Sequence, residues 1–186
     1  MKLQFRTQLG DLLKELKLPL TIAEVGVAEG LYSKQMMDWG TKLLYLIDKW
    51  EHSEVAGDSD KPQDWHDDNL QQTMMRMAVY DNRPEKYIIL QGDSVEMGEH
   101  IQDNSLSMVY LDADHSYEGV KRDIECFYQK VCVGGIIAGH DYLNLSYGVN
   151  QAVNEFILAN GYQETDIVII SENEPNNASF YFIKTH

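Results

Sequence analysis

A glycine-rich turn after a short apolar run is the first segment whose residues could do chemistry. The apolar run covers residues 20–25, and the turn reads Glu-Val-Gly-Val-Ala-Glu-Gly over residues 24–30. Glycine lets the backbone approach a ligand at positions where a side chain would collide. A second apolar run ends at Asp48, 22 positions after Gly26. In nucleotide-binding βαβ units an acid at about this distance binds ribose hydroxyls, so the spacing predicts a nucleotide-like ligand.

The turn differs from the G-x-G-x-x-G pattern of dinucleotide-binding proteins. It reads Glu-x-Gly-x-x-x-Gly from Glu24 through Gly26 to Gly30. A pyrophosphate would be poorly served by the negative charge of Glu24, whereas a ligand with a cationic, amino-acid-like end would suit it. An NAD-dependent oxidoreductase is therefore the alternative rather than the leading hypothesis.

Two longer motifs follow later in the chain. Residues 112–120 read DADHSYEGV and residues 134–142 read GGIIAGHDY. Together with the glycine turn they resemble a small family of class I S-adenosylmethionine-dependent methyltransferases, the methyltransferase domain 24-like proteins, over about residues 22–156. The resemblance implies methyl transfer from S-adenosylmethionine to a small-molecule acceptor, with oxygen as the expected methylated atom. A protein that binds the cofactor without catalysis is a further alternative.

The resemblance also implies roles for residues at the ends of the predicted strands. Glu24, Gly26 and Gly30 would surround the methionine part of the cofactor, and Asp48 would bind its ribose. Asp93 and Ser94 would border the adenine, although a serine at this position could equally cap a helix. Asp112 is a further candidate for binding the cofactor, whose amine it would orient if no metal were bound there.

A divalent metal is expected from similarity to the metal-dependent O-methyltransferases of the catechol and caffeoyl-coenzyme A kind. These enzymes place an acid after the fourth strand and an acidic pair after the fifth, positions that Asp112, His140 and Asp141 take here. Histidine in place of a carboxylate would shift the preference from Mg²⁺ towards Mn²⁺, Fe²⁺ or Zn²⁺. The alternative is a metal-free site in which His140 is a hydrogen-bonded wall.

His115 is the candidate general base. Its ordinary pKa lies near neutrality, and the adjacent Asp112 and Asp114 would raise it. An acceptor hydroxyl loses a proton as it attacks the methyl group, so a base or a metal is needed, and Asp112 is a catalytic candidate with it. Alternatively, His115 caps the helix that begins near Ser116.

Aromatic residues near these motifs are candidates for the walls of an acceptor pocket. Tyr117 and Tyr142 follow the fourth and fifth predicted strands, and Trp50 follows the second. Trp65 and His66 flank a polar connection after Trp50 and could close over an acceptor. As an alternative, Trp50 covers the edge of the sheet and Trp65 packs inside its helix.

Alternating apolar runs and helical patterns predict an α/β protein with a doubly wound, Rossmann-like, seven-stranded sheet. The sheet is expected to be mostly parallel, with an antiparallel C-terminal hairpin strand. We expect a single domain over residues 1–186, in which an N-terminal helix within residues 1–18 packs on the core, and Asp64 as an N-cap. Strands are predicted at residues 20–25, 42–47, 86–90, 106–111, 133–138, 166–170 and 179–183, and helices at 3–16, 32–39, 64–80, 94–101, 116–131 and 149–160.

Composition restricts the partners of the protein. The 186 residues carry a formal net charge of −15, and such a surface repels phosphate backbones, so we expect no nucleic acid partner. No apolar run approaches the roughly 20 residues that cross a bilayer, and the N-terminus lacks the apolar core of a signal peptide. Only Cys126 and Cys132 occur, which indicates reduced thiols rather than a zinc site. We expect a cytoplasmic protein with a small-molecule substrate, and a homodimer is possible.

Overall fold

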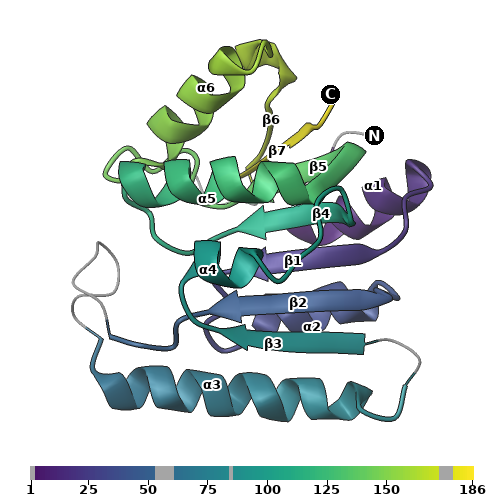
Figure 1. The fold of residues 1–186 in the computed structure, drawn as a ribbon, viewed down its shortest axis with the longest axis vertical. Coiled ribbons are helices and arrows are strands. Elements are labelled where there is room, and N and C mark those ends of the chain that lie inside the picture. Colours follow the sequence, from purple (N-terminus) through teal and green to yellow (C-terminus); the bar gives the residue numbers. More distant parts are fainter. Residues whose placement is uncertain (1–2, 53–60, 84–85, 172–177) are drawn as a thin grey trace.

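The computed structural model describes residues 3–52, 61–83, 86–171 and 178–186, and its strands form one twisted sheet (Figure 1). The strand order is β3-β2-β1-β4-β5-β7-β6. The first five strands of this order run parallel, whereas β7 is antiparallel to β5 and β6. This confirms the mostly parallel sheet with a closing hairpin, whose connection at residues 172–177 lies outside the described residues. The strands are β1 (Thr21–Val25), β2 (Leu43–Asp48), β3 (Lys86–Gln91), β4 (Leu106–Leu111), β5 (Val131–Gly139), β6 (Val168–Ile170) and β7 (Ser179–Ile183).

Helices cover both faces of the sheet. In Figure 1, α4 and α5 lie in front of the strands and α1 and α2 lie behind them. Helix α6 packs on α5, and α3 packs on α2. The helices are α1 (Leu9–Glu15), α2 (Leu31–Asp38), α3 (Gln63–Met77), α4 (Ser94–Gly98), α5 (Tyr117–Lys130) and α6 (Val149–Ala159), with 3₁₀ turns η1 (Arg6–Gln8), η2 (Ala78–Tyr80) and η3 (Glu164–Asp166).

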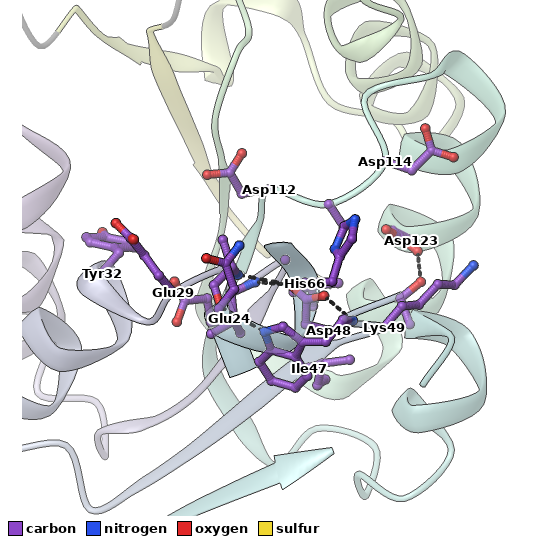
Figure 2. Close-up of a pocket in the computed structure, with 18 of the residues that line it drawn as sticks. Glu24, Glu29, Tyr32, Ile47, Asp48, Lys49, His66, Asp112, Asp114 and Asp123 are labelled. Carbon is purple, nitrogen blue, oxygen red and sulfur yellow. Dashed lines mark hydrogen bonds between the residues drawn. The ribbon is translucent and has the colours of Figure 1, made fainter. Parts of the chain in front are cut away.

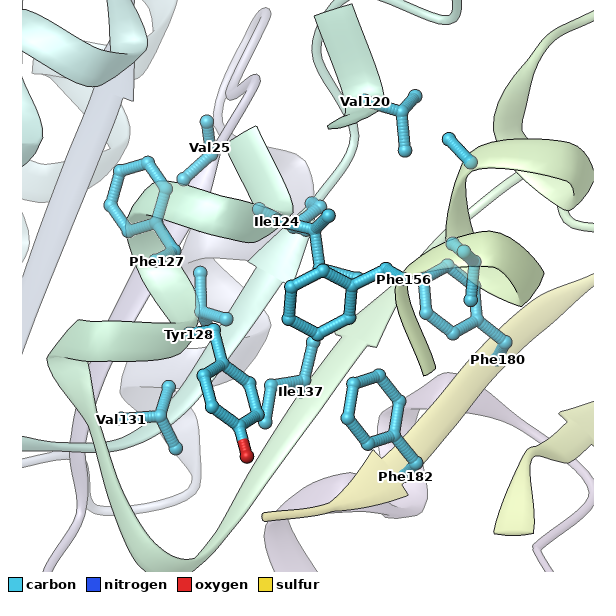
Figure 3. Packing of buried hydrophobic residues seen from close by; sticks show 14 of the residues in the cluster. Val25, Val120, Ile124, Phe127, Tyr128, Val131, Ile137, Phe156, Phe180 and Phe182 are labelled. Carbon is cyan, nitrogen blue, oxygen red and sulfur yellow. The ribbon is translucent and has the colours of Figure 1, made fainter. Parts of the chain in front are cut away.

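The sheet separates two apolar cores, and alternate side chains of a strand enter opposite ones. On β4, Val109 and Leu111 belong to the core under α5 and α6, whereas Met108 and Tyr110 belong to the core under α1 and α2. Figure 3 shows the first of these cores, where Phe156 of α6 lies beside Phe180 and Phe182 of β7. Burial on both faces explains why these strands read as continuous apolar runs rather than as alternating ones.

Two expectations about helix starts are wrong. Residues 3–16 do not form one α-helix, because the 3₁₀ turn η1 directly precedes a shorter α1. The N-cap position of α3 is taken by Pro62, not by Asp64, which lies in the first helical turn. A carboxylate is favourable there too, because it faces the positive end of the helix dipole.

Among the described residues, no helix is both long enough and apolar enough to cross a membrane. Cys126 and Cys132 are half-buried and form no disulfide with each other.

The parallel strands all end at one edge of the sheet. The chain order reverses between β1 and β4, because β2 and β3 lie on one side of β1 and β5 lies beyond β4. Ligands of open α/β sheets bind at such a reversal, outside the carboxyl ends of the strands. The residues that follow β1, β2 and β4 are therefore the ones that the fold gathers into a site.

Candidate functional site

A cavity of about 420 Å³ opens at this edge of the sheet, within the usual size range of small-molecule sites. Its walls come from the loops after β1, β2 and β4 and from α3 and α5 (Figure 2). Of the predicted site residues, the lining includes Glu24, Gly26, Asp48, Trp50, Ser94, Asp112 and His115. Those outside it are Gly30, Asp93, Tyr117, His140, Asp141 and Tyr142.

The glycine turn after β1 approaches the end of β4 closely. Gly26 has a φ of +87°, and a Cβ atom on it would lie 2.0 Å from the carbonyl oxygen of Asp112. Gly30 has a φ of +76° and is the N-cap residue of α2. Both positions therefore need glycine, one because of backbone contact and the other because of its left-handed conformation. Ala28 between them is also left-handed, with a φ of +50°.

Asp48 at the end of β2 holds this turn in place. Its Oδ2 accepts hydrogen bonds from the amides of Val27 at 2.8 Å and Ala28 at 2.9 Å. Its Oδ1 accepts one from the amide of Trp50 at 2.8 Å. A carboxylate offers about four acceptor positions. Asp48 therefore serves the loop with three of them and has about one left, among the described contacts, for a ligand hydroxyl.

Glu24 is a buried acid next to the turn. Its side chain is 2% exposed and accepts a short hydrogen bond from the hydroxyl of Ser33 on α2. Burial raises the pKa of Glu24 to about 8; the Ser33 hydrogen bond opposes this rise and the charge of Asp112 adds to it. A cationic group entering the cavity would favour the ionised form of Glu24, as expected for a site that receives an amine.

Ser94 and Asp123 line the far side of the cavity, and Asp93 lies next to them outside the lining. Asp93, not Ser94, is the N-cap residue of α4, and its carboxylate also pairs with Arg122 at 2.9 Å and Lys49 at 3.4 Å. The N-cap alternative for Ser94 is therefore wrong. Instead, the Ser94 hydroxyl donates to the carboxylate of Asp123 on α5 at 2.5 Å. Burial raises the pKa of Asp123 to about 6, and the Ser94 hydrogen bond counteracts it.

A cluster of two acids and two histidines lies beside the cavity, where β4 and β5 end. The Nε2 atom of His115 is 3.4 Å from Oδ1 of Asp112 and 3.0 Å from Oδ2 of Asp141. The Nδ1 atom of His140 is 3.4 Å from Oδ1 of Asp141 and 4.0 Å from Oδ1 of Asp112. The His115 ring stacks on Tyr147 at 4.6 Å, which fixes its plane.

These contacts change the protonation of the cluster. Burial by itself would lower the pKa of His115, but hydrogen bonds to Asp112 and Asp141 outweigh it and raise that pKa to about 10. Burial would raise the pKa of Asp141, but the two histidines hold it well below its usual range. His115 is therefore an imidazolium at neutral pH. The acid that joins Asp112 in raising its pKa is Asp141 rather than the predicted Asp114.

The helix-cap alternative for His115 is wrong. Ser116 caps α5, since its hydroxyl oxygen accepts from the amide of Gly119 at 3.1 Å. Asp114 supports the same turn by accepting from the amide of Ser116 at 2.8 Å.

The group of residues that could hold a metal ion differs in one member from the predicted one. Possible ligand atoms of Asp112, His115 and Asp141 all lie within 4.8 Å of one another. His140, predicted from the position of the Gly-Gly pair, is not part of this group. Asp141 has a φ of +57°, and this left-handed turn after β5 sets the direction in which its side chain leaves the backbone.

The predicted aromatic walls are placed differently. The Tyr117 hydroxyl donates to Glu155 on α6 at 2.6 Å, and the Tyr142 hydroxyl donates to Asn154 at 2.7 Å. Both tyrosines therefore join α6 to its surroundings and do not line the cavity. Trp50 does line it, and its Nε1 donates to the carbonyl of Ala28 at 2.8 Å, so it also supports the glycine turn.

The lining residues that the sequence analysis missed include Arg6, Asn69 and Asp123. Asn69 lies on α3 beside the predicted Trp65 and His66; it is 4% exposed, and its Nδ2 has no hydrogen-bond partner among the described residues. A buried amide left in this way at a cavity wall suits a ligand acceptor. The polar spacing of α3 was a weak signal for it, because exposed helix faces are polar as well.

Comparisons with solved structures agree with this fold. The O-methyltransferase NovP is 18% identical, with a TM-score of 0.69 over 97% of this chain and 78% of that one. The O-methyltransferase from Bacillus cereus in complex with SAH is 14% identical, with a TM-score of 0.63 over 96% and 80%. A candidate rRNA methylase from Clostridium thermocellum is 13% identical, with a TM-score of 0.65 over 99% and 98%.

At these identities the likeness establishes the fold alone. A search of the curated proteins finds no match to this sequence. The model of a family described as a methyltransferase domain matches residues 23–142, from the middle of β1 to the loop after β5. This span holds the glycine turn, Asp48 and both long motifs. The match argues against the alternative of an NAD-dependent oxidoreductase. The chain belongs to this methyltransferase family and is a class I methyltransferase that uses S-adenosylmethionine.

Proposed function

We propose that this protein methylates a hydroxyl oxygen of a small molecule. The observation that carries the proposal is the cluster of Asp112, His115 and Asp141, which lies beside the cavity where the methyl group would be presented. A hydroxyl needs a partner for its proton when it attacks a methyl group. Carboxylates and an imidazole within 4.8 Å of one another supply such a partner.

The cavity suits S-adenosylmethionine at both ends. Glu24, buried and with a raised pKa, favours a cationic amine, and the spare acceptor position of Asp48 favours a ribose hydroxyl. Ser94 and Asp123 would border the adenine at the opposite side, with Asp93 held behind them by Arg122. In Figure 2, Glu24 and Asp123 lie on opposite sides of Asp48, which matches a ligand that extends across the sheet edge.

S-adenosylmethionine supplies an electrophilic methyl group on a sulfonium sulfur. The acceptor oxygen forms a bond to this carbon as the carbon–sulfur bond breaks, and the electron pair of that bond returns to sulfur. The protein mainly aligns the reacting atoms. The hydroxyl proton must leave to the cluster. His115 is protonated at neutral pH and the two histidines hold the pKa of Asp141 low, so the carboxylate of Asp112 is the acceptor that remains. His115 becomes a base only after it has lost its own proton.

We further propose that a divalent cation binds this cluster. The oxygen, nitrogen, oxygen set of Asp112, His115 and Asp141 fits such an ion, and a bound ion would lower the pKa of an acceptor hydroxyl. Replacing the proton on His115 by a cation would also relieve the excess of negative charge between the two carboxylates.

Product analysis tests the oxygen assignment. The protein is incubated with methyl-labelled S-adenosylmethionine and a panel of catechols, phenols, sugar nucleotides, amines and thiols, and methylated products are identified by mass spectrometry. We expect label on oxygen and release of S-adenosylhomocysteine. Label on nitrogen or sulfur only would refute O-methylation, and tight cofactor binding without turnover of any acceptor would favour the non-catalytic alternative.

Chelation and two matched histidine variants test the metal. We expect excess chelator to abolish transfer, with Mg²⁺, Mn²⁺ or Zn²⁺ restoring it. We expect His115→Ala to lose bound metal in elemental analysis and His140→Ala to retain it, since His140 is outside the ligand group. Full activity in chelator would exclude the metal and leave proton removal to Asp112 and His115. Loss of metal in His140→Ala alone would restore the ligand set that the sequence suggested.

A further inference from the structure

Arg6 brings a positive charge to the acidic end of the cavity. It lies in η1, far in sequence from the strand-end motifs, and its side chain lines the cavity with 29% of its surface exposed. Its Nη1 atom is 3.9 Å from Oδ2 of Asp112 and donates to the hydroxyl of Tyr110 at 3.3 Å. Its charge also acts on Glu24, where it opposes the effect of burial on the pKa.

The sheet explains why these groups meet. Glu24 on β1 and Tyr110 on β4 are register partners in parallel strands, so their side chains leave the same face. Asp112 follows two residues after Tyr110 and continues this row. The Arg6 guanidinium lies over the ring of Tyr32 at 4.9 Å, and the Tyr32 hydroxyl donates to the carbonyl of Arg6 at 3.0 Å. Helix α2 thus holds both the backbone and the side chain of Arg6 at this end.

The other lysine and arginine residues of the lining are placed differently. Lys49 and Arg122 both pair with Asp93. In Figure 2, Lys49 lies on the side of Asp123, whereas Glu24 and Tyr32 lie on the opposite side. The end at Glu24 and Asp112 therefore combines two acids with Arg6, and the two sides of the cavity are not equivalent in charge.

Adjacent opposite charges match a zwitterion. An α-amino acid carries its ammonium and its carboxylate on one carbon atom, so a receptor for it needs an acid and a cation a few ångströms apart. A guanidinium is suited to a carboxylate because it can donate two parallel hydrogen bonds. Glu24 or Asp112 alone would attract the ammonium and repel the carboxylate of the same ligand.

We propose that Arg6 binds the α-carboxylate of the methionine part of S-adenosylmethionine, while Glu24 and Asp112 receive its α-ammonium. This inference rests on the proposed placement of the cofactor in this cavity. Arg6 is then a specificity residue, because it makes the protein select ligands that carry an intact amino-acid end.

Two ligands that differ only in the carboxylate test this role. Calorimetry measures the dissociation constants of S-adenosylhomocysteine and of its decarboxylated analogue, S-adenosyl-3-thiopropylamine. The wild type should prefer S-adenosylhomocysteine about tenfold or more, the effect of one charge-assisted hydrogen bond. Arg6→Met should reduce the preference to within about twofold, and Arg6→Lys, which keeps the charge without the planar fork, should give an intermediate value.

Lys49→Met is the matched control. It removes one positive charge from the same lining but on the side of Asp93, so it should change the binding of both ligands by the same factor. Thermal unfolding of each variant confirms that folded protein is compared, and Arg6→Lys carries the test if Arg6→Met does not fold.

The outcomes distinguish failure of this inference from failure of the proposed function on which it rests. Unchanged preference in both Arg6 variants would overturn the role of Arg6 while leaving the cofactor site intact. An unchanged S-adenosylhomocysteine affinity combined with a raised KM for an acceptor would overturn it too, and would assign Arg6 to the acceptor. Failure of the wild type to bind either ligand, or binding that Asp48→Ala does not weaken, would refute the proposed cofactor placement itself.

Discussion

At the scale of single residues, Glu24 has the most unusual environment in the cavity. An acid that is 2% exposed and faces a second acid is held protonated near neutral pH, with its pKa raised to about 8. The predicted ligand brings an ammonium group to this position. Binding should therefore ionise Glu24, and the released proton is a measurable sign that the amine lies there.

The pH dependence of cofactor binding follows from this linkage. Below pH 8, Glu24 must lose a proton to pair with the ammonium, so S-adenosylhomocysteine affinity should rise as pH increases from 6 to 8, by at most about tenfold per pH unit. Calorimetry at pH 7 in buffers of different ionisation enthalpy should detect close to one released proton. Glu24→Gln should remove both effects. Absence of proton release on binding to the wild type would contradict this position for the amine.

Asp48 has two roles, of which the sequence predicted only one, the binding of the ribose. Its carboxylate accepts from the amides of Val27, Ala28 and Trp50, and it is also the expected ribose ligand. Losing charge-assisted hydrogen bonds, which contribute roughly 1.5–3 kcal/mol each, affects folding as well as binding.

We expect Asp48→Ala to lower the free energy of unfolding by about 2–3 kcal/mol and to weaken S-adenosylhomocysteine binding about tenfold or more. Urea unfolding and calorimetry measure the two effects. Asp48→Asn, which keeps one acceptor oxygen, should be milder in both. Binding as tight as in the parent would refute the ribose assignment, and unchanged stability would show that the loop amides do not depend on this side chain.

At the scale of elements, the loops at the carboxyl edge of the sheet contain residues in left-handed backbone conformations. Gly26, Ala28, Trp50 and Asp141 all have positive φ angles, and each follows a strand that ends at the site. A left-handed residue other than glycine costs free energy and persists only where its surroundings hold it. Here the carboxylate of Asp48 and the indole of Trp50 hold the first two loops against each other.

Two glycines with nearly the same φ provide a controlled test of close packing at the turn. Gly26 has a φ of +87° and would place a Cβ 2.0 Å from Asp112, whereas Gly134 has a φ of +84° and open space around it. Gly134→Ala should lower the free energy of unfolding only by the cost of a left-handed alanine, about 1–2 kcal/mol, and should leave cofactor binding normal. Gly26→Ala adds a steric clash and should abolish binding. Chemical denaturation and calorimetry compare them, and equal behaviour of the two variants would contradict the close contact.

At the scale of the whole molecule, one sheet joins the two cores. Strand β4 contributes Val109 to one core and Tyr110 to the other. Loss of packing in either core would therefore disturb a strand that the other core also needs. Both ends of the cavity are built from this sheet, so we expect a ligand bound there to stabilise the entire fold.

We therefore expect residues 1–186 to unfold in a single cooperative transition, with calorimetric and van't Hoff enthalpies equal. S-adenosylhomocysteine at a hundred times its dissociation constant should stabilise the protein by about 2.7 kcal/mol and move the whole transition. Two resolved transitions, of which the ligand moved one, would show that the chain is not a single unit.

The order of the elements could be predicted from the sequence because it depends on local periodicity. Short continuous apolar runs bounded by turn residues favour strands buried on both faces, and the glycine turn after residues 20–25 predicts a ligand at the carboxyl edge of the sheet. Glu24, Gly26, Asp48 and Asp112 were identified in this way, and all four line the cavity. The sequence could not predict that η1 is a 3₁₀ turn rather than the first turn of an α-helix, because apolar spacing does not distinguish the two.

Tertiary structure alone decided which histidine completes the group of possible metal ligands. His140 also lies 3.4 Å from Asp141, but the group of possible ligands consists of Asp112, His115 and Asp141. The left-handed turn at Asp141 and the ring of Tyr147 set the directions of these side chains. Arg6 and Asn69 reach the cavity from η1 and α3, which no spacing along the chain connects to the strand ends. Sequence periodicity determines which edge of the sheet carries the site, whereas the direction of each side chain there depends on loop dihedrals and on helices packed from elsewhere in the chain.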